Sequence, residues 1–146
     1  MSITVRPLRP EDEPVWRDLW SAYLEFYEST VPEVVYSTTF GRLIDPQHRS
    51  RFCLVAEADG KVLGLVHAIY HEHNWRVEDV CYLQDLYVHP DARGTGIGRA
   101  LIEAVYKAAD ANGTSTVYWM TQDFNSTARL LYDRIATKTP FIKYQR

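Results

Sequence analysis

Residues 82–99 read YLQDLYVHPDARGTGIGR, and this stretch decides the fold of the chain. Its first half is apolar and aromatic and predicts a β-strand, which Pro90 ends because proline has no N–H to donate to a sheet. A helical period follows, in which apolar residues share one face: Ile97, Leu101, Ala104, Val105 and Ala108. The stretch therefore predicts a strand, a glycine-rich turn, and a helix that begins at the glycines.

The turn between these two elements is suited to bind an anion. The N–H groups of a helix's first turn have no partner within the helix, and the helix dipole is positive there. Glycine lacks the Cβ atom that would hold a phosphate away from these groups. We therefore expect a pyrophosphate or a similar anion to be bound by a run of seven residues: Arg93, Gly94, Thr95, Gly96, Ile97, Gly98 and Arg99.

Two common phosphate-binding motifs do not fit this turn. A P-loop requires Lys followed by Ser or Thr after its glycines, and no such pair follows here. A dinucleotide fingerprint that starts at Gly94 requires Gly or Ala at position 99, where Arg99 stands. The residues do match R-x-x-G-x-G, formed by Arg93, Gly96 and Gly98. This pattern resembles the coenzyme A pyrophosphate loop of the GNAT superfamily of N-acetyltransferases.

The composition predicts a single domain over residues 1–146. A chain of 146 residues buries about 70% of its unfolded surface, and its 46% hydrophobic content can form a core. The formal net charge of −3 fits a cationic substrate and argues against a nucleic-acid partner. No signal-peptide core or membrane-length apolar run is present, so we expect no membrane partner. Cys53 and Cys81 are expected to be buried free thiols, and the chain is expected to be cytoplasmic.

The rest of the chain predicts further strands and helices around the opening stretch. Strands are expected at residues 3–8, 52–58, 62–70, 80–88, 117–120 and 140–144. Helices are expected from residues 9–12 to about 27, at 37–44, at 97–111 and at 126–135. Asp59-Gly60 is typical of a type I′ hairpin between two of the strands. The order β-α-α-β-β-β-α-β-α-β predicts an antiparallel meander that runs into one right-handed parallel β-α-β unit.

This order is also that of the GNAT superfamily, and the resemblance extends over nearly the whole chain. It implies an α/β (α+β) fold, in which a mixed, mostly antiparallel sheet with a central parallel β-α-β splay is flanked by helices. In that fold the two parallel strands diverge, and the pantetheine arm of the co-substrate acetyl-CoA enters the gap. The resemblance implies that the backbone of Leu86, Tyr87 and Val88 contacts this arm. No metal is expected, because His71 and His73 have no obvious third ligand.

Residues 125–132, NSTARLLY, resemble the N-x-x-(A/S)-x-x-(L/F)-Y signature of the superfamily. The resemblance implies that Tyr132 protonates the departing coenzyme A sulfur and that Asn125 and Ala128 contact the coenzyme. A phenol suits this role because its usual pKa of ~10 keeps it protonated at neutral pH. From its spacing alone, Tyr132 also fits a core position on the apolar face of its helix.

The proton acceptor is less well defined by the sequence. A primary amine, with a usual pKa of ~10.4, must lose a proton before it can attack. The spermidine/spermine-type branch carries Glu-Asp in the strand before the glycine turn, whereas this chain has Gln84-Asp85, and Gln84 cannot titrate. Strand alternation is expected to place Asp85 on the opposite face from Gln84. Three options remain open: Asp85 acts through a water, Glu25 or Glu28 serves, or the enzyme captures the neutral fraction of its substrate.

Residues 16–27, WRDLWSAYLEFY, predict a helix that ends in aromatic rings and carboxylates. Rings and carboxylates suit a cationic amine, so the expected substrate-binding residues are Tyr23, Glu25, Tyr27 and Gln84. The pattern resembles the spermidine/spermine-type branch and its fungal relatives, described as acetylating histones, polyamines or amino acids. This implies direct attack of a small-molecule amine on acetyl-CoA, and a homodimer by analogy. The alternatives are a protein lysine or N-terminal acetyltransferase and a non-catalytic acyl-CoA-binding module.

Overall fold

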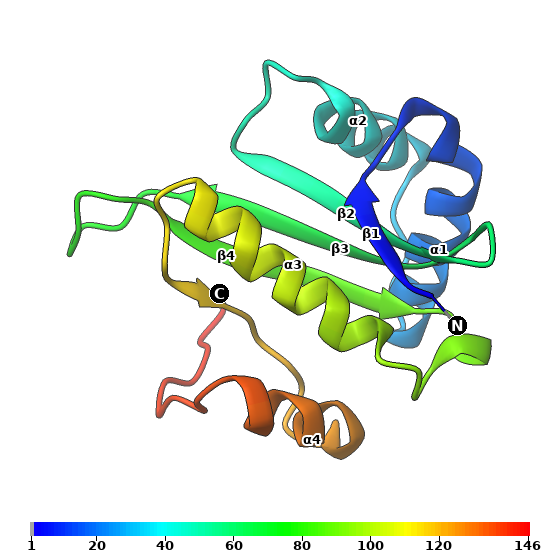
Figure 1. Ribbon diagram of the computed structural model, residues 1–146. Helices are drawn as coiled ribbons and strands as arrows, with labels where there is room; N and C mark the ends of the chain where they lie inside the picture. The colour runs from blue at the N-terminus through cyan, green and yellow to red at the C-terminus, as the bar shows by residue number, and fades with distance from the viewer. Residues whose placement is uncertain (1) are drawn as a thin grey trace.

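The computed structural model describes residues 2–146 and contains a five-stranded sheet with helices on both faces (Figure 1). The strands follow chain order across the sheet: β1 (Thr4–Pro7), β2 (Arg51–Ala58), β3 (Lys61–His71), β4 (Val80–Val88) and β5 (Val117–Tyr118). Pairing is antiparallel from β1 to β4 and parallel between β4 and β5. The predicted meander that runs into a parallel unit is therefore confirmed.

The helices divide between the two faces of the sheet. α1 (Glu13–Phe26) and α2 (Glu33–Ile44) cover one face, and α3 (Ile97–Ala111) covers the other (Figure 1). α4 (Ser126–Ile135) lies beyond β5, where Tyr106 of α3 donates a hydrogen bond to the Ile135 carbonyl at 3.1 Å. Short 3₁₀ turns, η1 (Pro10–Asp12) and η2 (Pro90–Ala92), lead towards α1 and α3. Among residues 2–146, no helix is both long enough and apolar enough to span a membrane.

Local sequence patterns predict most of the helix and strand boundaries correctly. α3 and α4 span the residues that their patterns predict, and Asp59 and Gly60 have the two positive φ angles, +53° and +76°, of a type I′ hairpin. α2 begins at Glu33, four positions before the predicted start at Ser37, because Pro32 stands as its N-cap with extended backbone. The helix therefore includes Val35, which packs into the core.

The strand expected at residues 140–144 does not form, and that prediction is wrong. These residues have no regular structure, and Phe141, Ile142 and Tyr144 are exposed. A strand needs a neighbour to pair with, and the β5 edge has only two residues, against the four predicted. Pro140 also has no N–H to donate. The parallel β4–β5 pair consequently forms one edge of the described sheet, so β5 has an open outer side.

Alternating side chains of the sheet supply two apolar layers. On the α3 side, Val66 packs with Leu101, Ile102 and Val105, all of them fully buried. On the opposite side, Leu65 packs beneath the aromatic residues of α1 and α2: Trp16, Trp20 and Phe40. The Trp16 and Trp20 rings stack with their centroids 5.2 Å apart. The aromatic face predicted for the first helix is thus mainly a core face, and only its C-terminal end is available to a site.

A buried ion pair holds β1 against the start of α1. Asp12 is 5% exposed and accepts hydrogen bonds from the Arg6 guanidinium at 2.8 and 3.0 Å and from the Arg9 backbone N–H at 2.8 Å. The hydrogen bonds from Arg6 are the main reason that the pKa of Asp12 lies below its usual range. The folded protein is therefore stabilised by the charged form of this carboxylate.

We expect Asp12→Asn to lower the free energy of unfolding by about 3 kcal/mol at neutral pH, because it removes the main charged partner of the largely buried Arg6 and leaves only the longer contact with Glu57. Since the folded pKa of Asp12 is depressed, its contribution is complete above the ordinary value of ~3.9 and is lost as the pH falls through the folded pKa. Urea unfolding of both proteins at neutral pH and near pH 3 measures this difference. A cost of the same size at both pH values would contradict the role given to the Asp12 charge.

Candidate active site

The glycine turn opens α3 with the backbone that an anion site requires. Gly94 and Gly96 have φ angles of +78° and +91°, a region that side chains with a Cβ rarely adopt, and α3 begins directly afterwards at Ile97. A Cβ added at either glycine would meet nothing within 4 Å, so both face open space. The turn therefore has the glycine backbone and the open space at Gly94 and Gly96 that an anion site requires, and anion binding there stays a prediction.

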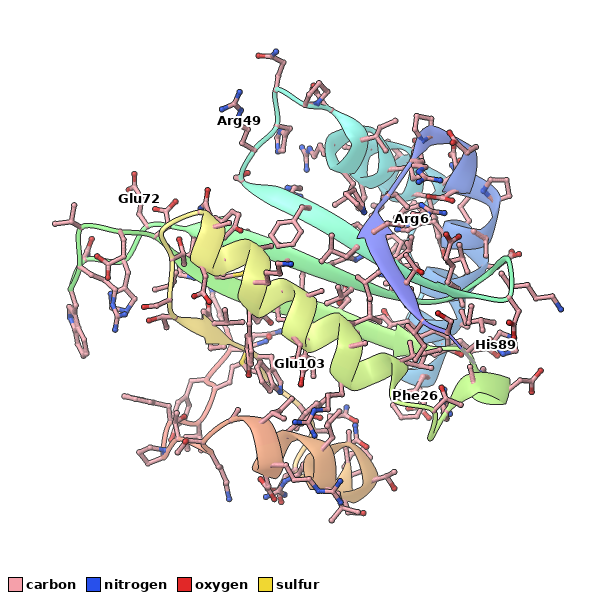
Figure 2. The ribbon with its side chains drawn as sticks, viewed as in Figure 1. Arg6, Phe26, Arg49, Glu72, His89 and Glu103 are labelled. Carbon is pink, nitrogen blue, oxygen red and sulfur yellow. The ribbon has the colours of Figure 1, made fainter. Side chains whose placement is uncertain are left out.

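The two arginines of the turn are held differently. Arg93 donates from Nε to the Val88 carbonyl at 3.2 Å, and its guanidinium carbon lies 5.5 Å from the centroid of the Tyr87 ring. These contacts fix its positive charge at the end of β4, beside the turn. Arg99 instead pairs with Glu103 at 2.7 Å on the exposed surface of α3. Figure 2 shows Phe26, at the end of α1, and His89, just after β4, at this same end of the molecule.

β4 and β5 diverge soon after they meet. β4 pairs with β3 up to Val88, but with β5 only at Cys81 and Tyr82. The Tyr82 and Tyr118 rings stack there at 4.9 Å and mark the last paired position. Within residues 2–146, no strand pairs with the far side of β4 at Leu86, Tyr87 and Val88. This is the gap expected from the resemblance to the superfamily, and its use by a pantetheine arm stays a prediction.

Tyr132 lies on α4, partly buried on the side that faces β5 and α3. Its ring meets the Trp119 ring edge-on, with centroids 5.4 Å apart, and both residues pack on the α3-side core. The Tyr132 hydroxyl makes no hydrogen bond within residues 2–146, yet it is not sealed from solvent. The ring of Tyr132 therefore packs in the core, while its O–H has no hydrogen-bond partner. A packing role and a catalytic role for Tyr132 are thus compatible.

The environment of Tyr132 favours the protonated phenol. Burial, with a smaller effect from the nearby Tyr27, raises the pKa of Tyr132 to about 12. If Tyr132 is the general acid, kcat should therefore show no falling limb near pH ~10, where an ordinary tyrosine ionises. The profile of kcat at saturating substrate between about pH 7 and 11 measures this. A decline in kcat centred near pH ~10 would show that burial does not keep the Tyr132 phenol protonated there.

Asn125 precedes α4 as its N-cap residue, but its side chain makes no capping hydrogen bond. Its amide nitrogen instead donates to the Thr121 hydroxyl at 3.3 Å, in the segment between β5 and α4. The Asn125 side-chain oxygen has no donor within residues 2–146. Ala128 is partly exposed one turn further on. Coenzyme contacts from these two residues stay predictions.

The end of α1 brings tyrosines next to Asp85. Burial is the main cause that raises the pKa of Tyr23, and the charge of Asp85 and a hydrogen bond with it act in the same direction. Burial and then Asp85 likewise raise the pKa of Tyr27. Tyr27, which directly follows α1, has a smaller influence on the pKa of Tyr132 on α4. Glu25 and Glu28 are exposed, and neither they nor Tyr23 and Tyr27 line the cavity described below.

Asp85 is also anchored by His67, Trp16 and Trp20, whose part in the site is not evident from the sequence. Its Oδ2 accepts a hydrogen bond from His67 Nδ1 at 2.8 Å and one from the Trp20 indole at 3.2 Å. The Trp16 indole donates to His67 Nε2 at 2.9 Å. Because an indole can only donate, Nε2 carries no hydrogen and Nδ1 carries the imidazole proton. His67 is therefore neutral and holds Asp85 in place with one oxygen occupied.

The expected placement of Gln84 and Asp85 on opposite faces is wrong. Asp85 pairs with His67 and Leu83 pairs with Ala68, so Gln84 is an extra residue in a β-bulge. A bulge interrupts strict alternation and re-aims neighbouring side chains. Both residues consequently line one cavity of about 290 Å³ between the sheet and the helices α1 and α2. No group of three His, Cys, Asp or Glu side chains suited to a metal occurs in the described residues.

Comparison with known proteins shows to which family the chain belongs. The model of the acetyltransferase (GNAT) family matches residues 14–136, which include the glycine turn, the diverging strands and Tyr132. The chain belongs to the GNAT family of acetyltransferases. The resemblance that rests on Arg93, Gly96, Gly98 and the signature at residues 125–132 is thereby confirmed. This GNAT chain is an acyltransferase enzyme, as its relatives indicate.

Curated relatives and solved structures agree with this membership. The chain is 42% identical over 145 residues to the D-amino-acid N-acetyltransferase HPA3 of Saccharomyces cerevisiae, covering 99% of this chain and 90% of that protein. It is 33% identical over 94 residues to the thialysine N-epsilon-acetyltransferase of Bos taurus, covering 59% and 55%. The structure of the aminoglycoside acetyltransferase AAC(6')-Iy with a coenzyme A bisubstrate analogue superposes with a TM-score of 0.86 at 19% identity, covering 100% and 98%. That structural match shows the fold.

Proposed function

We propose that this GNAT enzyme transfers the acetyl group of acetyl-CoA to the primary amine of a small molecule, an amino acid or a polyamine, by direct attack. The support from relatives is the amino-acid acetyltransferase of yeast, which aligns with nearly all of this chain. A structural neighbour whose title describes a coenzyme A bisubstrate analogue supports the same donor.

The observation that carries the proposal is the pair formed by a carboxylate in the cavity wall and a phenol with an unpaired hydroxyl. Asp85 lines the cavity on the face of the sheet covered by α1 and α2, whereas Tyr132 packs on the α3-side core and its hydroxyl makes no hydrogen bond within residues 2–146. We infer that these two groups are the proton acceptor and the proton donor of one reaction. Acetyl transfer to an amine needs both groups.

Each residue then has a defined role. Acetyl-CoA supplies the thioester, and the turn from Arg93 to Arg99 would hold its pyrophosphate while the open side of β4 would bind its pantetheine arm. Asp85 accepts the amine proton through a bridging water, because its Oδ2 already binds His67 and Trp20. As the C–N bond forms and the C–S bond breaks, Tyr132 donates its proton to the departing sulfur. The Tyr132 phenolate that results regains its proton from solvent.

Thiol release from acetyl-CoA tests this proposal with a panel of acceptors. The panel contains amino acids of both hands, polyamines, lysine peptides and N-terminal peptides. We expect release with free amino acids or polyamines. Release with peptides alone would indicate a protein acetyltransferase. Coenzyme binding without release for any acceptor would indicate a non-catalytic acyl-CoA-binding module.

We further propose that the chain is a single domain, cytoplasmic and homodimeric, and that it does not bind nucleic acid. The two buried free cysteines, Cys53 and Cys81, support a reducing compartment. Large apolar residues exposed on α4 and the following segment, including Leu130 and Phe141, support an interface between copies. Sedimentation equilibrium of the purified chain tests the dimer, and a monomer at all concentrations would exclude it.

A further inference from the structure

The cavity beside Asp85 has an apolar wall and a charged end. Its wall is made by residues of α1, α2 and the segment between them: Leu24, Val31, Val35 and Leu43. Most of its polar residues come from the sheet, and they include Arg51 at the start of β2 together with Gln84 and Asp85 of β4. A volume of about 290 Å³ suits a small molecule that has one apolar side and a few polar groups.

Arg51 has no protein group to neutralise it. Among residues 2–146, no carboxylate lies within ion-pair distance of its guanidinium, and its Nε is shielded from solvent without a hydrogen-bond partner. The Nε of Arg6 is shielded in the same way, but its guanidinium pairs with Asp12 and Glu57, whereas the guanidinium of Arg51 has no charged partner. An arginine in a cavity wall whose charge no carboxylate offsets indicates an anionic ligand group.

We propose that Arg51 binds the α-carboxylate of an amino-acid acceptor. The planar guanidinium presents parallel N–H donors that match a carboxylate. Register places Arg51 on the same face of the sheet as His67 and Asp85, because Arg51 pairs with Ile69 while Cys53 pairs with His67. The two opposite charges therefore line one cavity from different strands.

This charge arrangement matches a zwitterion. An amino acid carries its ammonium and its carboxylate on the same carbon, so Asp85 would attract the first while Arg51 binds the second. Its side chain would lie against the apolar wall formed by α2 and the end of α1. A polyamine has no carboxylate and would place a further positive charge near Arg51. This inference rests on the proposed function and narrows its acceptor to an amino acid with an apolar side chain.

The test compares two acceptors that differ only by the carboxylate, leucine of either hand and 3-methylbutylamine. In the wild-type enzyme we expect a higher kcat/KM for leucine. In Arg51→Met we expect the KM for leucine to rise about 10- to 100-fold, the effect of losing hydrogen bonds to a charged group, while kcat changes little. The ratio of kcat/KM for leucine to kcat/KM for 3-methylbutylamine should fall by the same factor. Arg51→Lys keeps the positive charge but loses the parallel N–H donors of the guanidinium. Its KM for leucine should therefore lie between those of the wild type and Arg51→Met.

Arg49→Met is the matched control, because Arg49 lies in the exposed loop before β2 and points away from the sheet (Figure 2). It should leave both acceptors unaffected, and thermal melting checks that each variant is folded. An unchanged leucine preference in Arg51→Met, or equal use of both acceptors by the wild type, would overturn the role of Arg51 and leave the proposed function standing. If the wild type acetylates polyamines of the panel above but neither of these two acceptors, the role of Arg51 is overturned alone, and if it acetylates no amine at all, the proposed function is overturned as well.

Discussion

Tyr132→Phe should lower kcat by about 10²- to 10⁴-fold, the usual effect of losing a general acid. The substitution removes only a hydroxyl that makes no hydrogen bond within residues 2–146, while the ring keeps its contact with Trp119. Stability and acetyl-CoA affinity should therefore change little. The measurement is steady-state kcat at saturating acceptor, together with calorimetric binding of coenzyme A.

Tyr106→Phe is the control for this experiment. Tyr106 also packs on the α3-side core, but its hydroxyl donates to the Ile135 carbonyl at the end of α4. Its loss should cost about 1 kcal/mol of stability and leave kcat within a few-fold of the wild type. If both variants lose activity equally, activity depends on the placement of α4 and the experiment assigns no specific role to the Tyr132 hydroxyl. If neither does, Tyr132 has no part in the chemistry.

Gly96→Trp should abolish measurable binding of coenzyme A. A side chain at position 96 would project into the open space in front of the first N–H groups of α3, where the pyrophosphate is expected. The φ of +91° adds a backbone cost of about 1–2 kcal/mol for any residue with a Cβ. Isothermal titration with coenzyme A measures the loss, and circular dichroism confirms that the variant is folded.

Gly113→Trp separates the steric effect from the backbone strain. Gly113 follows the other end of α3, has a φ of +75°, and a Cβ there would also meet nothing within 4 Å. Its substitution should therefore carry a similar strain without obstructing the turn, and coenzyme affinity should stay unchanged. Retained binding in a folded Gly96→Trp protein would place the pyrophosphate elsewhere.

Features that depend on local chemistry were predictable from the sequence. The start of α3 at Ile97 follows from the glycines before it, and the Asp59-Gly60 hairpin follows from a dipeptide that accepts two positive φ angles. Tyr132 could be singled out because its signature lies within a single helix. In each case the deciding residues are close neighbours in the chain.

Features that depend on register across strands were not predictable. The contact between His67 and Asp85 requires the pairing of β3 with β4, and the bulge at Gln84 shifts that pairing by one residue. Trp16 reaches His67 across 51 positions of sequence. In the sequence, His67 is a single histidine within an apolar run, and nothing there indicates its partner. The side of the sheet on which Gln84 lies is predicted wrongly from periodicity, because the prediction assumes unbroken alternation along the strand. The strand expected at residues 140–144 likewise depended on a partner that the two-residue β5 does not supply.

The most direct test of the account is to measure thiol release and acetylated acceptor in the same reaction, with acetyl-CoA and free leucine of either hand. We predict that one molecule of N-acetyl-leucine, identified by mass spectrometry, accumulates for each thiol released, and that both signals fall together in Tyr132→Phe. Thiol release without an acetylated product, or binding of coenzyme A with neither signal for any amine, would contradict acetyl transfer at this site.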